Sequence, residues 1–138
     1  MMKFMPFLFL LTSSQLFSQS HVEWDATVDD CNVLVVSAEI DEGWHIYSQF
    51  QNEDAGPIPT EITVELDDRE INIAAEPVCT VKYDENYGGE VRYFEGEVIF
   101  RVALPDDVEG DFNVRVVFMT CNEEGCLPPE MKEFKLSI

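Results

Sequence analysis

Residues 111–130 read DFNVRVVFMTCNEEGCLPPE, a strongly alternating segment followed by a small cysteine loop. From Phe112 to Phe118, apolar and polar side chains alternate with the period of a strand that buries one face. Two cysteines follow, Cys121 and Cys126, and the residues between them include a pair of acids. Pro128 and its neighbour Pro129 prevent the strand ladder from simply continuing, because proline lacks an N–H and fixes φ. The stretch therefore predicts two thiols at a turn on the rim of a β-scaffold, a suitable place for exposed sulfur chemistry.

Other segments alternate in the same way, and each alternation marks one buried face. The expected inward residues are Leu34, Val36, Ala38 and Ile40; Ile62, Val64 and Leu66; Val98, Phe100, Val102 and Leu104; and Phe134, Leu136 and Ile138. Turn residues separate these runs, at Asp29-Asp30, Asp41-Glu42-Gly43, Asp67-Asp68, Glu95-Gly96 and Glu109-Gly110. The turn at Glu95-Gly96 is expected to close a tight hairpin between Tyr93-Phe94 and the run from Val98.

This pattern predicts an all-β protein with about seven to nine short strands, arranged as an antiparallel, immunoglobulin-like β-sandwich. A β-barrel is the alternative architecture. The polar segment Gln49 to Pro59 ends in Gly56-Pro57-Ile58-Pro59 and is expected to be a long loop. A chain of 138 residues is long enough for one domain with one core.

The N-terminus has the composition of a secretory signal peptide. Lys3 supplies the positive charge, the segment Phe4 to Leu11 is apolar, and a polar stretch follows. Ser18 and Ser20 are small residues at the −3 and −1 positions of a cleavage site, and cleavage after Ser18 fits equally well. We expect residues 1–20 to be the signal peptide and residues 21–138 to be the exported domain. An N-terminal membrane anchor is the alternative, although the apolar run is short for a bilayer.

The chain is strongly acidic, with a formal net charge of −20. Removing residues 1–20 deletes one of its 8 basic residues and no acid, which moves the charge to −21. Such a charge argues against nucleic acid and against anionic membrane surfaces as partners. The acids are spread along the chain, which favours a well-solvated surface.

All four cysteines lie beyond the predicted leader, in a chain expected to enter an oxidising compartment. Four cysteines allow three complete pairings, and their spacing favours Cys121 with Cys126. Cys79 is in phase with neighbouring apolar residues, whereas Cys31 is out of phase with the core set that begins at Leu34. We therefore expect Cys31 and Cys79 not to be linked, because a disulfide requires close Cα atoms.

The Cys121–Cys126 ring has two interpretations that composition alone does not separate. As a structural staple, so small a ring stabilises by roughly 2 kcal/mol, less than a crosslink between distant strands would. As an exposed pair beside a turn, it has the form of a redox site. Small secreted domains often carry disulfides with no redox role, which keeps the first interpretation open.

Three segments together resemble the N-terminal periplasmic domain of DsbD-type thiol:disulfide interchange proteins. CNEEGCLPPE (121–130) is similar to that family's active-site segment, in which two cysteines precede two prolines. Asp84-Glu85-Asn86-Tyr87-Gly88 resembles its cap loop, and Glu42-Gly43-Trp44-His45-Ile46-Tyr47 resembles its Gly-aromatic-x-x-Tyr segment. The resemblance extends from about Val33 to the end of the chain.

This resemblance implies an immunoglobulin-like domain that receives electrons from a thioredoxin-like donor and passes them to exported proteins, without a cofactor. Cys126 would be the cysteine that meets the partner, and Cys121 would be the resolving cysteine. The implied cap and partner-facing residues are Asp84, Glu85, Asn86, Tyr87, His45, Tyr47 and Pro128.

Two departures from the family pattern qualify these expectations. The family has phenylalanine immediately after the acidic pair of the cap, where this chain has Asn86, with the aromatic Tyr87 next. The larger family members also continue into a transmembrane hub and a thioredoxin-like domain. Because this sequence ends at Ile138, the donor is expected to be a separate protein.

Other chemistries are less well supported by the residues. Two thiols with His21 or His45 could bind zinc or copper, but neither histidine lies at ligand spacing from the cysteines, so no metal is expected. A Cys-His hydrolase would need an oriented base and an oxyanion hole, and the sequence shows no sign of them. The main alternative is a secreted, non-catalytic β-sandwich that binds another protein and keeps Cys121–Cys126 as a permanent crosslink.

The surroundings of the cysteines suggest slow, partner-dependent chemistry. Glu123, Glu124 and Glu130 lie close in sequence, and negative neighbours and burial should raise the thiol pKa above about 8.5. The nearest basic residue is Lys132. Among the aromatic residues, Trp44, Tyr83 and Tyr93 are expected to be ordinary strand residues, whereas Tyr47 and Tyr87 fit a core position and a partner-facing position equally well.

Overall fold

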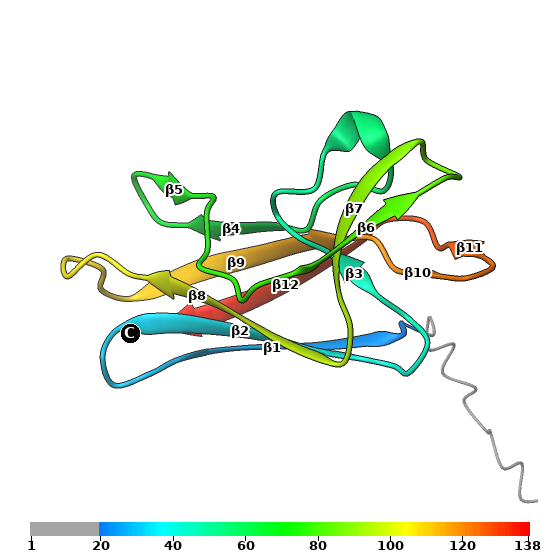
Figure 1. The fold of residues 1–138 in the computed structure, drawn as a ribbon. Coiled ribbons are helices and arrows are strands. Elements are labelled where there is room, and N and C mark those ends of the chain that lie inside the picture. Colours follow the sequence, from blue (N-terminus) through cyan, green and yellow to red (C-terminus); the bar gives the residue numbers. More distant parts are fainter. Residues whose placement is uncertain (1–19) are drawn as a thin grey trace, which may run out of the picture.

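The computed structural model describes residues 20–138, so almost all of the predicted signal peptide lies outside the described residues. The described chain consists of strands joined by loops and one short 3-10 helix, η1 (Glu53–Ala55) (Figure 1). Eight strands have five residues or more. They are β1 (Val22–Val28), β2 (Val33–Ile40), β4 (Glu61–Glu65), β6 (Thr80–Asp84), β7 (Gly89–Phe94), β8 (Glu97–Ala103), β9 (Asp111–Phe118) and β12 (Glu130–Ser137). The two-residue strands are β3 (Ile46–Tyr47), β5 (Glu70–Ile71), β10 (Cys121–Asn122) and β11 (Gly125–Cys126).

Two antiparallel sheets face each other and form the predicted sandwich. One sheet has the order β1-β2-β8, and the other has the order β12-β9-β4-β5. Figure 1 shows them as two layers, with β1 and β2 on one side and β9 and β12 on the other. Trp24 of the first sheet packs on Phe118 of the second, with ring centroids 5.1 Å apart. The all-β, immunoglobulin-like fold expected from the sequence is therefore confirmed.

The core contains the residues that the alternation placed inward. Most of it comes from the runs that begin at Leu34, Val98 and Phe112. Leu34, Phe100 and Val114 are among the residues that have no exposed surface. β12 is less enclosed, because Phe134 and Leu136 are half-buried and Ile138 is exposed. β1 had not been predicted, although its residues alternate between buried and exposed in the same manner.

The hairpin expected at Glu95-Gly96 is wrong. β7 pairs with β3 and β6 in a third sheet, whereas β8 pairs with β2 in the sandwich. The chain turns at Gly96, where φ is +72°, and the Gly96 carbonyl accepts a hydrogen bond from the Ile40 N–H at 2.7 Å. Phe94 and Val98 are both buried in the main core. Glu95 and Gly96 therefore form a corner between two sheets, which sequence alone does not distinguish from a hairpin turn.

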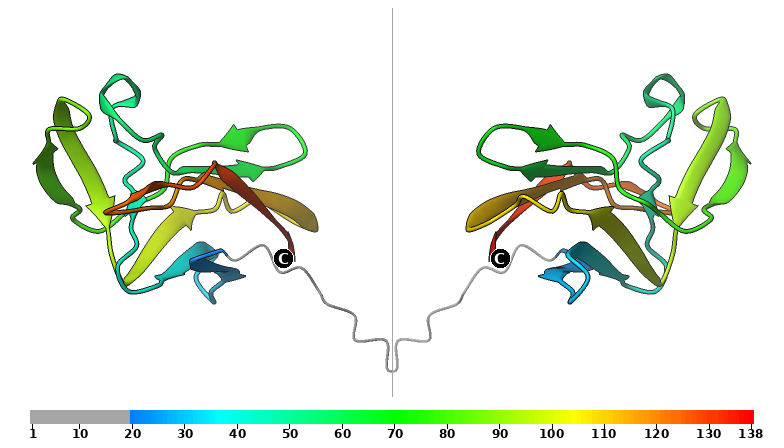
Figure 2. Two further views of the ribbon diagram at one scale, coloured as in Figure 1. Left: turned by 90° about the vertical axis from the view of Figure 1, so that its right-hand side faces the viewer. Right: turned by 90° about the vertical axis from the view of Figure 1, so that its left-hand side faces the viewer.

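The third sheet, β3-β7-β6, extends from one end of the sandwich together with the loop that contains η1 (Figure 2). Apart from η1, the segment Gln49 to Pro59 is irregular, as expected. The Arg92 N–H of β7 donates to the side-chain oxygen of Gln51 at 2.6 Å, which joins this loop to the sheet. The Ser48 hydroxyl donates to Glu76 at 2.6 Å and ties the start of the loop to the chain before β6. These contacts fix the end of the domain where the cysteines lie.

Candidate functional site

The disulfide joins two very short strands that continue from β9. Cys121 of β10 lies directly opposite Cys126 of β11, and their sulfur atoms are bonded, with Cα atoms 4.0 Å apart. The Asn122 side-chain oxygen accepts the N–H groups of Glu124 and Gly125, at 2.9 and 3.1 Å, and so shapes the turn between the strands. The pairing favoured by the spacing is confirmed, and it lies at a turn on the rim of the scaffold.

The two sulfur-bearing residues differ in their access to solvent. Cys121 is only 2% exposed and forms a small buried cluster with Tyr47 and Val91. Cys126 is half-buried and packs against that cluster from outside. Because a thiolate must approach the sulfur that it attacks, Cys126 is the more accessible target.

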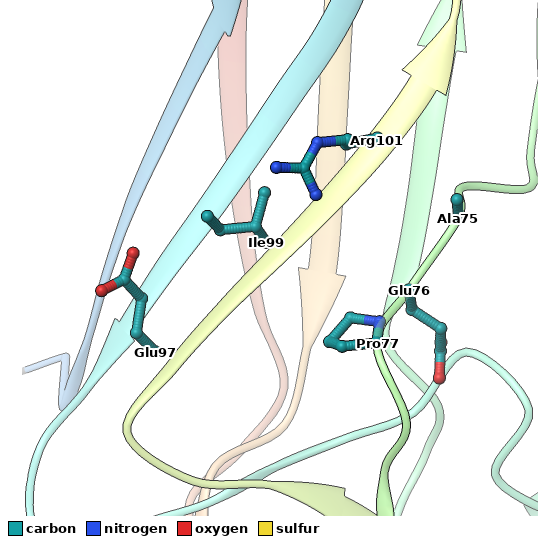
Figure 3. A pocket seen from close by; sticks show the side chains of 6 residues that line it. All are labelled: Ala75, Glu76, Pro77, Glu97, Ile99 and Arg101. Carbon is teal, nitrogen blue, oxygen red and sulfur yellow. The ribbon is translucent and has the colours of Figure 1, made fainter.

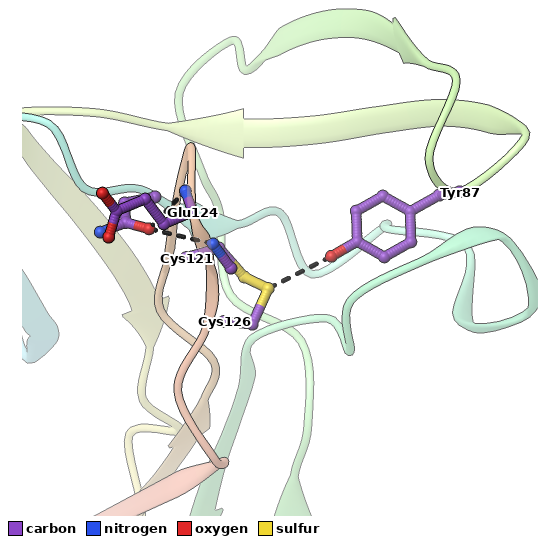
Figure 4. The surroundings of a disulfide bond; sticks show 6 residues. Tyr87, Cys121, Glu124 and Cys126 are labelled. Atoms are coloured by element: carbon purple, nitrogen blue, oxygen red, sulfur yellow. Dashed lines mark hydrogen bonds between the residues drawn. A yellow bond between two sulfur atoms is a disulfide. The ribbon is translucent and has the colours of Figure 1, made fainter.

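A tyrosine from the β6–β7 turn lies over the accessible sulfur. The hydroxyl oxygen of Tyr87 is 3.2 Å from Cys126 Sγ (Figure 4). The hydroxyl must donate in this contact, because a sulfur in a disulfide carries no hydrogen. The turn is held by the Asn86 N–H, which donates to the Asp84 carboxylate at 2.8 Å, and by the Gly88 N–H, which donates to the Asp84 carbonyl at 2.9 Å.

The loop with η1 supports the ring of this tyrosine. A Cβ atom built on Gly56 would come within 3.3 Å of Tyr87 Cγ, closer than most side-chain contacts. Glycine at this position therefore lets the ring lie against the backbone of the loop. From the sequence, the Gly56-Pro57 pair indicates only a turn, and nothing in it marks Gly56 as part of the site.

The structure places the residues expected to form the cap and the partner-facing surface in different settings. The four exposed residues are Glu85, Asn86, Tyr87 and Pro128. The two half-buried residues are Asp84 and His45, and the buried residue is Tyr47. Tyr47 is 2% exposed and lies in the cluster with Cys121. Burial, followed by the nearby Tyr87 and Asp84, raises the pKa of Tyr47, so its hydroxyl stays protonated at neutral pH.

The His45 backbone is joined to that of Cys121 by two hydrogen bonds. The His45 N–H donates to the Cys121 carbonyl at 3.0 Å, and the Cys121 N–H donates to the His45 carbonyl at 3.1 Å. The sequence gives no sign that a histidine lies near the cysteine loop, because the two segments are far apart along the chain. The fold brings them together.

Cys31 and Cys79 are not joined to each other, as expected. Cys31 is exposed in the turn between β1 and β2, and its N–H donates to the Asp29 carboxylate at 2.9 Å. Cys79 is half-buried and packs against the main core. The inward and outward orientations expected from their phase are therefore both observed, and only Cys31 has an exposed thiol.

His21 lies in a separate arrangement. Its ring stacks on Trp44, with centroids 3.9 Å apart, and its Nδ1 is 3.1 Å from an Asp41 carboxylate oxygen. Trp44 packs against the main core and not against the disulfide cluster. Among residues 20–138, no three His, Cys, Asp or Glu side chains are grouped so that they could hold a metal ion.

A groove beside β8 is separate from this site. It is lined by residues 75–77 and by Glu97, Ile99 and Arg101 (Figure 3). None of these residues belongs to the disulfide cluster. No helix in the described part of the chain combines the length and the apolar character that crossing a bilayer requires.

We expect the Tyr87→Ala variant to be reduced by glutathione about two- to tenfold faster than the unmodified chain. The variant loses both the ring over Cys126 and a hydrogen bond of about 0.5–1.5 kcal/mol. The rate is measured by quenching samples with acid and counting free thiols. The stability should change little, since Tyr87 is 41% exposed.

Tyr83→Ala is the matched control, because Tyr83 lies on the same hairpin, is 62% exposed and makes no side-chain hydrogen bond to sulfur. Equal reduction rates in the unmodified chain and in Tyr87→Ala would show that Tyr87 does not shield the disulfide.

A family model and several solved structures match this chain. The family model described as "Thiol:disulfide interchange protein DsbD, N-terminal" matches residues 13–138. No curated protein matches the chain. The Neisseria meningitidis DsbD N-terminal domain, in its reduced form, is 19% identical, with a TM-score of 0.65 over 85% of each chain.

Two further solved structures have the same fold. One is the complex between the DsbD N-terminal and PilB N-terminal domains of Neisseria meningitidis, at 16% identity, with a TM-score of 0.67 over 88% of this chain and 87% of that one. The other is the N-terminal periplasmic domain of ScsB from Proteus mirabilis, at 17% identity and a TM-score of 0.59. This match covers 84% of the chain described here but only 45% of the ScsB chain.

Proposed function

Because the chain belongs to the family of N-terminal domains of the thiol:disulfide interchange protein DsbD, we propose that it passes electrons from a thioredoxin-like donor to exported acceptor proteins through Cys121 and Cys126. The observation that carries this proposal is the unequal burial of the two bonded cysteines. Cys121 is enclosed, whereas Cys126 is half-buried under a single tyrosine hydroxyl. A permanent crosslink would not need one of its two sulfurs to remain accessible.

The proposed reduction proceeds through a mixed disulfide. A thiolate of the donor attacks Cys126 Sγ, the bond to Cys121 breaks, and Cys121 leaves with the electron pair as a thiolate. A second donor thiolate then attacks the donor sulfur in the mixed disulfide and releases Cys126. The donor dithiol becomes a disulfide, and the domain gains two electrons and, from solvent, the protons of two thiols.

Transfer to the acceptor is the same exchange in the opposite direction. The Cys126 thiolate attacks an acceptor disulfide, and Cys121 then attacks Cys126 and releases the reduced acceptor. No step requires a cofactor. The unequal access to the two sulfurs supports Cys126 as the cysteine that meets both partners, and Cys121 as the resolving cysteine.

The proposed docking surface surrounds Cys126. The exposed positions of Glu85, Asn86, Tyr87 and Pro128 support direct contact with a partner, and Asp84 holds the turn that carries three of them. Tyr47 would act from beneath, as the buried floor of the disulfide. In the Neisseria complex, a DsbD N-terminal domain is bound to another protein domain, which supports a domain-sized partner for this chain.

We place this activity outside the cytoplasm, in the periplasm or an equivalent compartment. The signal-like composition of residues 1–20 supports export, and residues 21–138 would then form the working domain with no part inserted in a membrane. One of the similar solved structures, the ScsB domain from Proteus mirabilis, is described as a periplasmic domain.

The redox potential separates this proposal from a structural crosslink. The chain is equilibrated with defined ratios of reduced and oxidised dithiothreitol or glutathione, and the free thiols are alkylated and counted by mass. We expect a potential less negative than about −300 mV, because structural disulfides lie below that value. A potential well below −300 mV would instead favour the protein-binding sandwich with a permanent Cys121–Cys126 bond.

A further inference from the structure

His45 is paired with Cys121 through the backbone, on the side of Cys121 away from Cys126. The two residues form an antiparallel pair with reciprocal N–H···O bonds of 3.0 and 3.1 Å. Directly opposed residues on antiparallel strands point their side chains to the same face, with Cβ atoms about 4.5–5.5 Å apart. Cys121 is opposed in the same way to Cys126 on its other side. His45, Cys121 and Cys126 therefore form a row across three neighbouring backbone segments.

The contacts of the imidazole ring confirm this orientation. Its centroid is 5.4 Å from that of Tyr47 and 5.1 Å from that of Tyr93. Tyr47 is opposed to Tyr93 across β3 and β7, and both residues pack in the cluster that contains the two cysteines. His45 is itself half-buried. The two tyrosines therefore hold the ring on the disulfide side, while solvent can still exchange protons with it.

The His45 ring is neutral at ordinary pH because its pKa is lowered, mainly by burial. Burial is the largest influence and lowers the pKa of His45 below its usual 6.5. Glu95 and Asp84 oppose this shift, and Lys82 adds to it. The tyrosines that touch the ring are Tyr47 and Tyr93, and Tyr47, whose pKa is raised, is not a base at neutral pH.

Cys121 needs help in forming a thiolate. A buried thiol resists ionisation, because the charged form loses its hydration. Only the thiolate attacks a disulfide, so an enclosed resolving cysteine would otherwise react slowly. A neutral imidazole on the same face is a suitable base for such a thiol.

We propose that His45 is the proton acceptor for Cys121 in the resolving step of thiol–disulfide exchange. This proposal rests on the proposed function. With Cys126 bonded to an acceptor sulfur, His45 takes the proton from the Cys121 thiol. The Cys121 thiolate forms the bond to Cys126 Sγ, the bond between Cys126 and the acceptor breaks, and the acceptor leaves with the electron pair. The proton on His45 then passes to solvent or to the departing thiolate.

The test follows the resolving step alone. The reduced chain, with Cys31→Ser to remove its exposed thiol, is mixed with excess oxidised glutathione, so that the glutathione adduct forms quickly and then decays by an internal, first-order step. Acid-quenched samples are analysed by mass spectrometry from pH 5 to pH 9. The variants are His45→Phe, which keeps an aromatic ring, and His45→Gln, which keeps a polar side chain. His21→Phe is the matched control, because that imidazole pairs with Asp41 and stacks on Trp44.

In the unmodified chain, the decay rate should rise with pH as His45 loses its proton, with an inflection below about 6.5, and then level off. Both His45 variants should lose this inflection, and their rates should rise tenfold per pH unit towards the thiol pKa. At pH 7 they should decay about 100-fold more slowly, at the low end of what a positioned base contributes. His21→Phe should behave as the unmodified chain.

An unchanged pH profile in folded His45→Phe or His45→Gln would overturn the role of His45 and leave the proposed function intact. A uniform slowing at every pH, with the inflection retained, would show that His45 acts only through packing and would also overturn it. Failure of the unmodified chain to resolve the adduct at any pH would count against the proposed function itself.

Discussion

The Cys121→Ser variant is expected to accumulate a stable mixed disulfide with a thioredoxin-like protein through Cys126, whereas Cys126→Ser is expected to trap little. The physical reason is access. Cys121 is 2% exposed and packs with Tyr47 and Val91, so a partner sulfur cannot approach it without opening the cluster. Cys126 is half-buried, and the Tyr87 hydroxyl lies 3.2 Å from its sulfur.

Trapping is measured against a thioredoxin-like protein that lacks its own resolving cysteine and whose remaining cysteine is first converted to a mixed disulfide with thionitrobenzoate. Attack by Cys126 then expels thionitrobenzoate, and the adducts are followed by non-reducing gels and mass spectrometry. Cys31 is the main source of a false signal, because its thiol is exposed. Each variant is therefore also made with Cys31→Ser, which removes that route without touching the disulfide cluster. Equal trapping by the two variants would remove the assigned polarity. The absence of trapping by both would favour the structural crosslink.

The second large effect concerns the strand that carries the cysteine loop. Phe118, the last residue of β9, has no exposed surface and packs on Trp24 across the sandwich. Phe118→Ala should lower the free energy of unfolding by about 3–5 kcal/mol, from lost burial and from the cavity left behind. Small domains have only about 5–15 kcal/mol in total, so this change removes a large share of the stability.

The measurement is guanidinium unfolding of the oxidised chain, so that the disulfide is the same in every sample. Phe50→Ala is the matched control, because it removes the same atoms from a side chain that is 61% exposed. It should change the midpoint little. Equal midpoints for Phe118→Ala and Phe50→Ala would mean that the end of β9 is not part of the cooperative core.

Most of the fold follows from the alternation in the sequence. Each run of period two marks a strand and its inward face without reference to the rest of the chain. That is why Leu34, Val64 and Phe100 were correctly placed in the core. β1 carries the same alternation, but it was not predicted as a strand; it begins directly after the predicted leader.

The wrong hairpin has a different origin. A two-residue turn containing glycine between two strands fits a hairpin and a corner between sheets equally well. Here, the Gly96 carbonyl pairs with β2, and Phe94 and Val98 both reach the main core. The partner of each strand therefore depends on contacts that are distant in sequence, and these do not appear in a local pattern.

The buried faces and the position of the cysteine loop at the end of β9 can be predicted from the sequence, because alternation and short loop spacing are local properties of the chain. The surroundings of the two sulfurs depend instead on how the sheets and loops pack together. The corner at Gly96 separates β7, in the third sheet, from β8, in the sandwich. The packing of the third sheet brings Tyr87 to Cys126 and His45 to Cys121. Gly56 joins them from a loop held by hydrogen bonds to β7. In the packed molecule Cys121 is enclosed, whereas Cys126 remains accessible. This difference in burial depends on every segment that packs around the two cysteines.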